Sequence, residues 1–158
     1  MGMAEYNKYY NDICQVAHNS DLNKQELSYV LNKILTKYDI TLDTKNQYDN
    51  TFLHCAIYNR DIHTTTFLIE EGADIHMRGY AGFTPIHLAA ANNDIHIINL
   101  LAGRDACPNE EDHFGCTPLH IAAFYGNLET IELLVTALEV DINEVNDGGH
   151  TITSCCFQ

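Results

Sequence analysis

The sequence predicts an all-α fold built from stacked helix-turn-helix units joined by turn-rich loops. The first observation is an internal repeat, because Thr-Pro-Ile-His-Leu-Ala-Ala at 84–90 returns as Thr-Pro-Leu-His-Ile-Ala-Ala at 117–123. A weaker copy, Thr-Phe-Leu-His-Cys-Ala-Ile, stands 33 residues upstream of the first, at 51–57. The second observation is a stretch of helically spaced apolar residues after each copy. A fixed period of this length indicates one small structural unit stacked on itself.

Each copy carries the start signals of a short helix. Thr84 and Thr117 stand at the N-cap position, where the hydroxyl can accept from unpaired backbone N–H groups. Pro85 and Pro118 stand at the first helical position, where a missing N–H has no consequence. Gly126 is expected to close the helix that begins at Pro118, because glycine tolerates a positive φ.

A second helix is predicted after each copy, over 62–71, 95–102 and 128–137, from apolar residues at helical spacing. The stretches between repeats, 77–83 and 110–116, contain Gly79, Gly82 and Gly115 and are predicted to be turns.

The Thr-Pro-Leu-His-x-Ala-Ala signature and its spacing resemble the ankyrin repeat. The resemblance implies an ankyrin-repeat solenoid whose loops project as β-turn fingers, with repeats at 46–78, 79–111 and 112–145. Residues 5–45 are interpreted as a diverged N-terminal capping repeat, with helices near 5–17 and over 24–37. Residues 146–158 are interpreted as a truncated repeat or tail, because no second helix follows Thr151.

The charge of the chain limits the partners that it can bind. Eight Lys+Arg stand against 22 Asp+Glu, a net charge of −14, and no Lys or Arg follows Arg104. Such a surface repels phosphate backbones and anionic lipid, so it disfavours nucleic acid and favours a protein with a basic surface. The alternative is that the acidity only maintains solubility. No 18-residue apolar run and no secretory signal is visible, and six cysteines without disulfide or metal spacing favour the cytoplasm.

Catalysis and metal binding are not expected. The resemblance implies that His54, His87 and His120, which repeat at the period, form hydrogen bonds within and between repeats. No zinc-type spacing, phosphate loop, nucleophile elbow or carboxylate pair is present. We therefore expect no catalytic residue, no metal site and no cofactor, although a regulatory fragment of a longer enzyme is a third interpretation.

The resemblance also implies that a partner binds to the finger tips and to the exposed side of the first helices. Carrying over the family's variable positions predicts a binding surface, and seven of the 15 aromatic residues of the chain fall on such positions. The predicted residues are Tyr48, Tyr58, Arg78, Tyr80, Phe83, Asn92, Glu111, His113, Phe114, Phe124 and Tyr125. With Glu110, Asp112 and Asp147 beside them, they describe a groove for a basic, partly apolar protein segment. The alternative is that some of these rings pack over neighbouring repeats.

The last four residues, Cys-Cys-Phe-Gln, fit a C-a-a-X prenylation motif with Cys155 as the acceptor. This predicts, as the alternative function, a lipidated adaptor, or an effector that an intracellular bacterium delivers to the host cytosol. The acidic stretch before it lacks the basic second signal that stable anchoring needs. The alternative is that Cys155 and Cys156 fill the small inward positions of a shortened fourth repeat. An uncapped last repeat would also allow self-association through 128–137.

Overall fold

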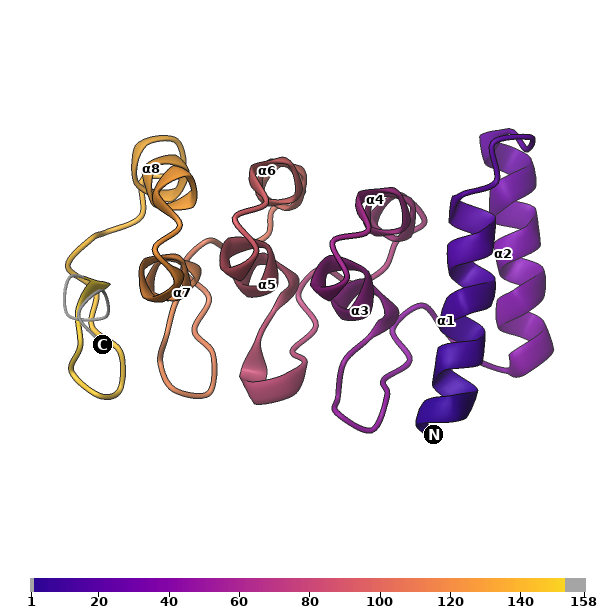
Figure 1. Ribbon diagram of the computed structural model, residues 1–158, viewed down its shortest axis with the longest axis horizontal. Coiled ribbons are helices and arrows are strands. Elements are labelled where there is room, and N and C mark those ends of the chain that lie inside the picture. The colour runs from indigo at the N-terminus through magenta and orange to yellow at the C-terminus, as the bar shows by residue number, and fades with distance from the viewer. Residues whose placement is uncertain (1, 153–158) are drawn as a thin grey trace. The chain divides into compact units, whose positions relative to one another are not determined.

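The computed structural model of the protein describes residues 2–152, and this part of the chain is helical without extended strands. The helices are α1 (Met3–Ala17), α2 (Lys24–Tyr38), α3 (Phe52–Tyr58), α4 (Ile62–Glu70), α5 (Pro85–Ala91), α6 (Ile95–Ala102), α7 (Pro118–Tyr125) and α8 (Leu128–Thr136), with a 3-10 turn η1 (Tyr80–Gly82) before α5. The predicted all-α class of paired helices is therefore confirmed. The chain divides into two compact units, Met1–Met77 and Arg78–Gln158, which are described in turn (Figure 1).

In the first unit, α1 packs against α2 and α4, and α3 packs against α4. Helix α1 buries Tyr6, Tyr9, Ile13 and Val16, which recur every three or four residues and so form one apolar side. Tyr6 stacks on Phe52 of α3 with ring centroids 4.6 Å apart. An aromatic pair in this arrangement adds to the stabilisation from buried area, so it anchors α1 on the α3–α4 hairpin.

Helix α2 begins at a complete capping box. The Asn23 side chain accepts from the backbone N–H groups of Gln25 and Glu26, and the Glu26 carboxylate accepts from the backbone N–H of Asn23. Asp39 ends the helix in the left-handed conformation, at φ 52°. Helices α1 and α2 lie antiparallel over the segment predicted as a capping repeat (Figure 1), and both are slightly longer than predicted.

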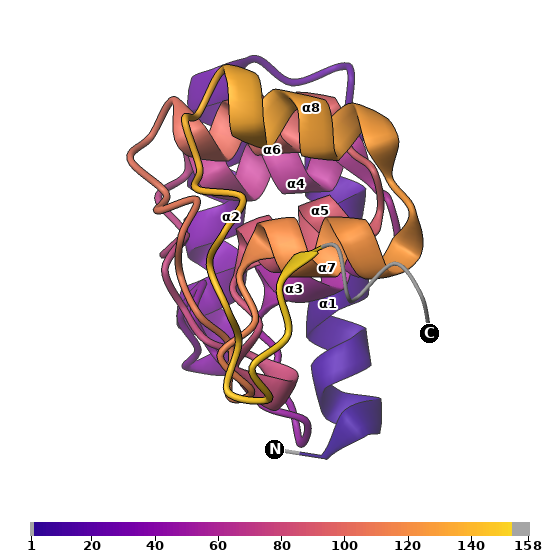
Figure 2. The ribbon, with the colours of Figure 1, turned by 90° about the vertical axis from the view of Figure 1, so that its left-hand side faces the viewer.

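In the second unit, α5 packs on α7 and α6 packs on α8. Pro85 and Pro118 occupy the first helical positions, as predicted, and Gly126 closes α7 at φ 69°. Ala89 and Ala122 are fully buried, and their small side chains let the two short helices approach closely. Figure 2 shows α8 above α7, with the yellow loop that follows α8 running past α7 to a turn.

Helices α4 and α6 begin at aspartate caps that the repeat signature did not predict. The Asp61 carboxylate accepts from the backbone N–H of Thr64 at 3.0 Å, and the Asp94 carboxylate accepts from that of Ile97 at 3.1 Å. Helices α4 and α8 end at Glu70 and Thr136, one residue earlier than predicted, which is within the usual variation of helix ends.

Candidate binding surface

Two loops of the second unit are closed turns that are organised by the side chain of their first residue. Asp112 begins the turn 112–116, and its carboxylate accepts from the backbone N–H groups of Phe114 and Cys116 at 2.8 and 3.0 Å. Asn146 begins the turn 146–150, and its amide oxygen accepts from the backbone N–H of His150 at 3.0 Å. These side chains supply hydrogen-bond acceptors for backbone N–H groups of the turn, so they hold the turns in one conformation.

Two further turns have this first position occupied by an asparagine in one case and by a glycine in the other. In the first unit, the Asn46 oxygen accepts from the backbone N–H groups of Tyr48 and Asn50 at 2.9 and 3.1 Å. In the second unit the position is Gly79, and its backbone N–H donates to the Phe83 carbonyl at 2.8 Å, a bond that the turns 46–50, 112–116 and 146–150 form as well. Sequence reasoning missed this role, and the recurrence of Asn or Asp near the repeat period was the signal that could have revealed it.

Neighbouring turns of the second unit are hydrogen-bonded to one another. The His113 N–H donates to the Ala81 carbonyl at 3.0 Å, and the Asp147 N–H donates to the Phe114 carbonyl at 3.1 Å. The approach is so close that a Cβ at Gly82, where φ is +81°, would lie 2.7 Å from the His113 backbone nitrogen. Glycine is therefore required at this contact, and the turns form a ladder that fixes their tips.

His87 joins helix α5 to the next turn. Its Nε2 lies 3.0 Å from the Cys116 carbonyl, and its Nδ1 lies 2.8 Å from the Thr84 hydroxyl and 3.2 Å from the Thr84 backbone nitrogen. Because a carbonyl can only accept, Nε2 carries the proton and Nδ1 of the neutral ring accepts from Thr84. The ring thus completes the cap of α5 and holds the following turn in place.

The same arrangement recurs one repeat later. His120 lies 2.9 Å from the Thr117 hydroxyl through Nδ1 and 3.1 Å from the His150 carbonyl through Nε2. Burial lowers the pKa of His87, because a charged ring would lose its hydration, and the Cys116 carbonyl only partly opposes this effect. The family-implied interpretation of these histidines as framework agrees with their geometry.

Four aromatic side chains of the second unit extend into solvent from this framework. Tyr80 lies in η1, Phe114 lies in the turn 112–116, and Phe124 and Tyr125 lie at the end of α7. Their exposed fractions are 66, 62, 58 and 59 %. Phe124 and Tyr125 meet edge to face with ring centroids 5.2 Å apart. We call these four residues the aromatic group, and their exposure agrees with the prediction that they are available to a partner.

Two other predicted residues are less available. Phe83 is half-buried, and its ring stacks on His87 with centroids 5.6 Å apart and planes 10° apart. Phe83 therefore packs on a residue of its own predicted repeat, and not over a neighbouring repeat as the alternative given above proposed. Asn92 is also half-buried, at the C-cap of α5.

The acidic border of the predicted groove is smaller than the sequence suggested. Asp112 is buried and organises its turn, so its carboxylate is not available to a partner. Glu110 is half-buried and lies 2.6 Å from Arg78, whose guanidinium also donates to the Glu111 carbonyl. The Arg78 charge is therefore offset locally. Glu111 and His113 have exposed side chains.

The first unit holds the two remaining predicted residues. Tyr48 is exposed at the tip of the turn that Asn46 organises, and Tyr58 is exposed at the last position of α3. Next to Tyr58, the Asn59 amide donates to the Tyr10 hydroxyl of α1 at 3.4 Å. Hydrogen bonds therefore hold the backbone next to each tyrosine: those of Asn46 in the turn of Tyr48, and that of Asn59 beside Tyr58.

Three observations on the described residues concern metal binding, thiol reactivity and membrane spanning. Within 2–152, no group of three His, Cys, Asp or Glu is placed to hold a metal ion. Burial raises the pKa of the Cys55 thiol, which makes a reactive thiolate unfavourable there. No helix among these residues is long and apolar enough to cross a bilayer. Cys155, the predicted lipidation site, lies outside the described residues.

Comparison with known families agrees with this arrangement of helices and turns. The family model for ankyrin repeats, in three copies, matches residues 4–112 and again residues 78–146. Among curated proteins, none gives a significant match to the sequence.

Proposed function

Because this chain belongs to the ankyrin-repeat family, whose members are in general protein–protein interaction modules, we propose that it is a non-enzymatic module that binds a protein with a basic, partly apolar surface. The binding surface is the aromatic group of the second unit, extended by its exposed polar neighbours Glu111 and His113. Tyr48 and Tyr58 of the first unit are proposed as further contacts.

The observation that carries the proposal is the exposure of four aromatic side chains on a backbone held by hydrogen bonds. Exposure of a large aromatic ring to water does not stabilise a protein. Protein interfaces, in contrast, are enriched in tyrosine, and a few such residues supply most of the binding energy. A rigid framework reduces the conformational entropy that is lost on binding. The ladder of turns supplies that rigidity for Phe114, and the closed turn 79–83 supplies it for Tyr80.

The charge of the second unit supports a basic partner. Residues 78–158 contain two Lys+Arg and eleven Asp+Glu, a net charge of −9. Complementary charge mainly accelerates encounter and excludes partners of the same sign, while the buried aromatic contacts supply affinity. A segment that alternates basic and apolar side chains meets both requirements.

The proposal is tested by capture from a eukaryotic lysate, followed by quantitative mass spectrometry, with the wild type and three variants as baits. The double variants Tyr80→Ala/Phe114→Ala and Phe124→Ala/Tyr125→Ala remove the aromatic group in two halves. Ile142→Ala is the control, because Ile142 is also an exposed apolar residue of the second unit but lies outside the proposed surface. We expect one set of basic proteins to bind the wild type and the control and to be lost from both double variants. Each single replacement should weaken binding by about 1–3 kcal/mol.

Circular dichroism and thermal unfolding of the same baits separate binding from folding. The side chains replaced are exposed, so the helical signal and the unfolding midpoint should be unchanged. If all baits recover the same proteins, or if none recovers a protein enriched in Lys and Arg, the proposed surface is wrong.

The lipidated alternative is favoured only by the Cys-Cys-Phe-Gln sequence at 155–158. It predicts that Cys155→Ser moves the protein from the membrane fraction to the cytosol of a eukaryotic cell, with Cys156→Ser as the control. An unchanged distribution would leave the cytoplasm, which we propose from the cysteine spacing, as the site of action.

A further inference from the structure

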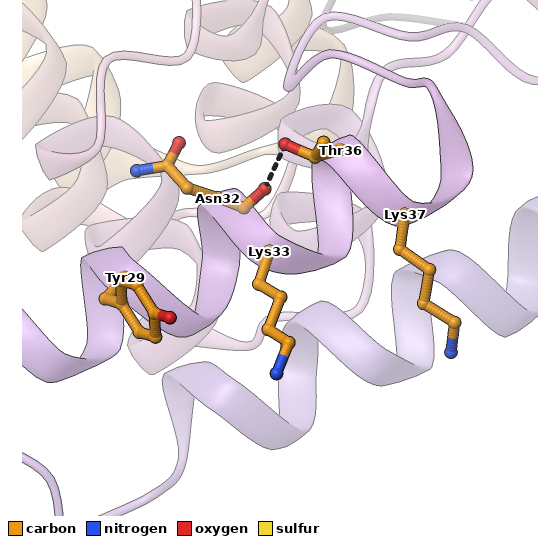
Figure 3. A pocket seen from close by; sticks show the side chains of 5 residues that line it. All are labelled: Tyr29, Asn32, Lys33, Thr36 and Lys37. Atoms are coloured by element: carbon orange, nitrogen blue, oxygen red, sulfur yellow. Dashed lines mark hydrogen bonds between the residues drawn. The ribbon is translucent and has the colours of Figure 1, made fainter.

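The outer side of α2, in the first unit, is basic although the chain as a whole is acidic. Tyr29, Lys33 and Lys37 are one helical turn apart and project from the same side of the helix (Figure 3). With Asn32 and Thr36 they line an open depression of about 480 Å³. Tyr29 is 70 % exposed, and neither lysine forms an ion pair with another described residue. We call Tyr29, Lys33 and Lys37 the α2 lysine face.

A third lysine adds to this charge. The ammonium groups of Lys8 and Lys37 lie 5.4 and 4.7 Å from the centroid of the Tyr38 ring. The Asp12 carboxylate beside them accepts from the Tyr38 hydroxyl at 2.8 Å. Lys8 and Lys37 therefore share the Tyr38 ring, and the Asp12 carboxylate near them already accepts a hydrogen bond from Tyr38. With Lys33 on the same side of α2, these ammonium groups can attract the acidic groups of a partner.

Helix α8, in the second unit, has a side that no described element covers. Ile98 of α6 is fully buried, whereas Ile131 stands one period later in α8 and is only half-buried. Leu128 on the same side is 76 % exposed, and Val135 is half-buried. Glu132 beside them is exposed. We call Leu128, Ile131, Glu132 and Val135 the α8 edge.

The opposite side of α8 faces the preceding repeat, which fixes the direction of the α8 edge. The Asn93 amide donates to the Glu129 carboxylate at 3.0 Å, and the Thr130 hydroxyl donates to the Asn93 side-chain oxygen at 2.8 Å. The α8 edge is therefore the surface on which a further repeat would stack, and its apolar side chains remain in water without one.

We propose that the α2 lysine face of one copy of the chain binds the α8 edge of a second copy. Glu132 would pair with Lys33 or Lys37, while the lysine stems and the Tyr29 ring would cover Leu128 and Ile131. Charge favours this unlike pairing, because α2 against α2 brings lysines together and α8 against α8 brings Glu132 against Glu132. The contact joins two different surfaces, so it can propagate from copy to copy unless the rotation closes a ring.

Each partner contributes essentially one helix, so the association should be weak and visible only at high protein concentration. It should also weaken as salt is added, because both charged groups are exposed. The α2 lysine face and the α8 edge share no residue with the aromatic group. Self-association can therefore fail while the proposed function holds, and the proposed function can fail while self-association holds.

The test is sedimentation velocity over a range of protein concentrations at low and high salt. For the wild type we expect the average mass to rise above 17.8 kDa with concentration at low salt and to fall towards it at high salt. Lys33→Glu/Lys37→Glu and Glu132→Lys should each weaken association on the order of tenfold or more. A mixture of these two variants is the decisive sample. Each variant alone brings like charges together, whereas both contacts between the two variants pair opposite charges. An equimolar mixture should therefore associate although neither variant does so alone.

Two control variants carry the same changes in net charge elsewhere. Lys45→Glu/Arg60→Glu matches the double lysine variant, and Asp21→Lys matches Glu132→Lys. Both controls should associate like the wild type, and circular dichroism confirms that every variant is folded. A wild type that stays monomeric at all concentrations would overturn the proposal. So would equal effects of test and control variants, or a mixture of the two test variants that does not associate.

Discussion

Gly82 illustrates how a single residue can be needed for two reasons. Its φ of +81° disfavours any side chain, and the His113 backbone lies where a Cβ would be placed. Gly126 has a similar φ of +69°, but nothing lies within 4 Å of its Cβ position. A side chain at Gly126 would therefore meet only conformational strain, whereas a side chain at Gly82 would meet both strain and a steric clash.

We predict that Gly82→Ala destabilises the second unit more than Gly126→Ala does. Gly126→Ala should lower the free energy of unfolding by about 1–2 kcal/mol, the usual penalty for a left-handed residue with a side chain. Gly82→Ala should add about 1–3 kcal/mol for the displaced neighbouring turn. Urea unfolding followed by circular dichroism measures both values. Equal losses would mean that the turns separate at no cost.

His87 makes the stability of the second unit depend on pH. In the unfolded chain histidine has a pKa near 6.5, and burial lowers the pKa in the folded state. Between these two values the unfolded chain binds more protons, so the free energy of unfolding falls as the pH decreases below about 6.5. Above that pH the ring is neutral in both states and contributes no pH dependence.

The corresponding prediction is that the urea midpoint decreases from about pH 7 to about pH 5, and that His87→Gln reduces this decrease. The exposed His96 supplies the control, since His96→Gln should retain the decrease of the wild type. An unchanged slope in His87→Gln would show that other groups cause the pH dependence.

At the scale of the element, the turn is as well organised as the helix that follows it. The Asp112 carboxylate accepts two backbone N–H groups within its own turn, and the turn hydrogen-bonds to its neighbours. Asn46 and Asn146 perform the same task in other turns with an amide oxygen. The interaction therefore requires an acceptor at this position but not a charge.

We predict that Asp112→Asn retains the turn and that Asp112→Ala loosens it. The alanine variant leaves two backbone donors unpaired, at a cost of about 1–3 kcal/mol, whereas asparagine keeps an acceptor in place. Hydrogen exchange at the Phe114 and Cys116 amides should accelerate strongly in Asp112→Ala and little in Asp112→Asn. Similar exchange in the two variants would contradict this role for the side-chain oxygen.

At the scale of the whole molecule, charge is distributed unevenly along the chain. Residues 1–77 contain six Lys+Arg and eleven Asp+Glu, a net charge of −5, compared with −9 for residues 78–158. The second unit also contains the aromatic group, so long-range attraction and short-range contacts coincide there. The basic side chains of the first unit include the exposed α2 lysine face.

We therefore predict that the affinity for a basic partner falls steeply with ionic strength. Between about 0.05 and 0.5 M salt the Debye length shortens severalfold, and the dissociation constant should rise on the order of tenfold or more. Isothermal titration calorimetry with a captured partner measures this change. Binding that is insensitive to salt would indicate an apolar partner rather than a basic one.

The helices and their boundaries followed from local chemistry and could be predicted from the residues alone. The Thr-Pro pairs at 84–85 and 117–118 each begin a helix, and Gly126 ends one, because caps act within a single turn of backbone. The repeat period revealed the unit because each copy carries these signals again. Apolar spacing placed α2 for the same reason, since amphipathicity is a property of consecutive residues.

The availability of individual side chains required the folded chain. Phe83 and Phe114 are both aromatic residues at finger positions, yet one stacks on His87 and the other is exposed. Asp112 and Glu111 are adjacent acids, yet only Glu111 extends into solvent. Burial and pairing depend on which groups a neighbouring repeat brings within a few ångströms, and that distance is set by packing across the sequence period. Local patterns thus predict the repeat, and its tertiary contacts select the residues that a partner can reach.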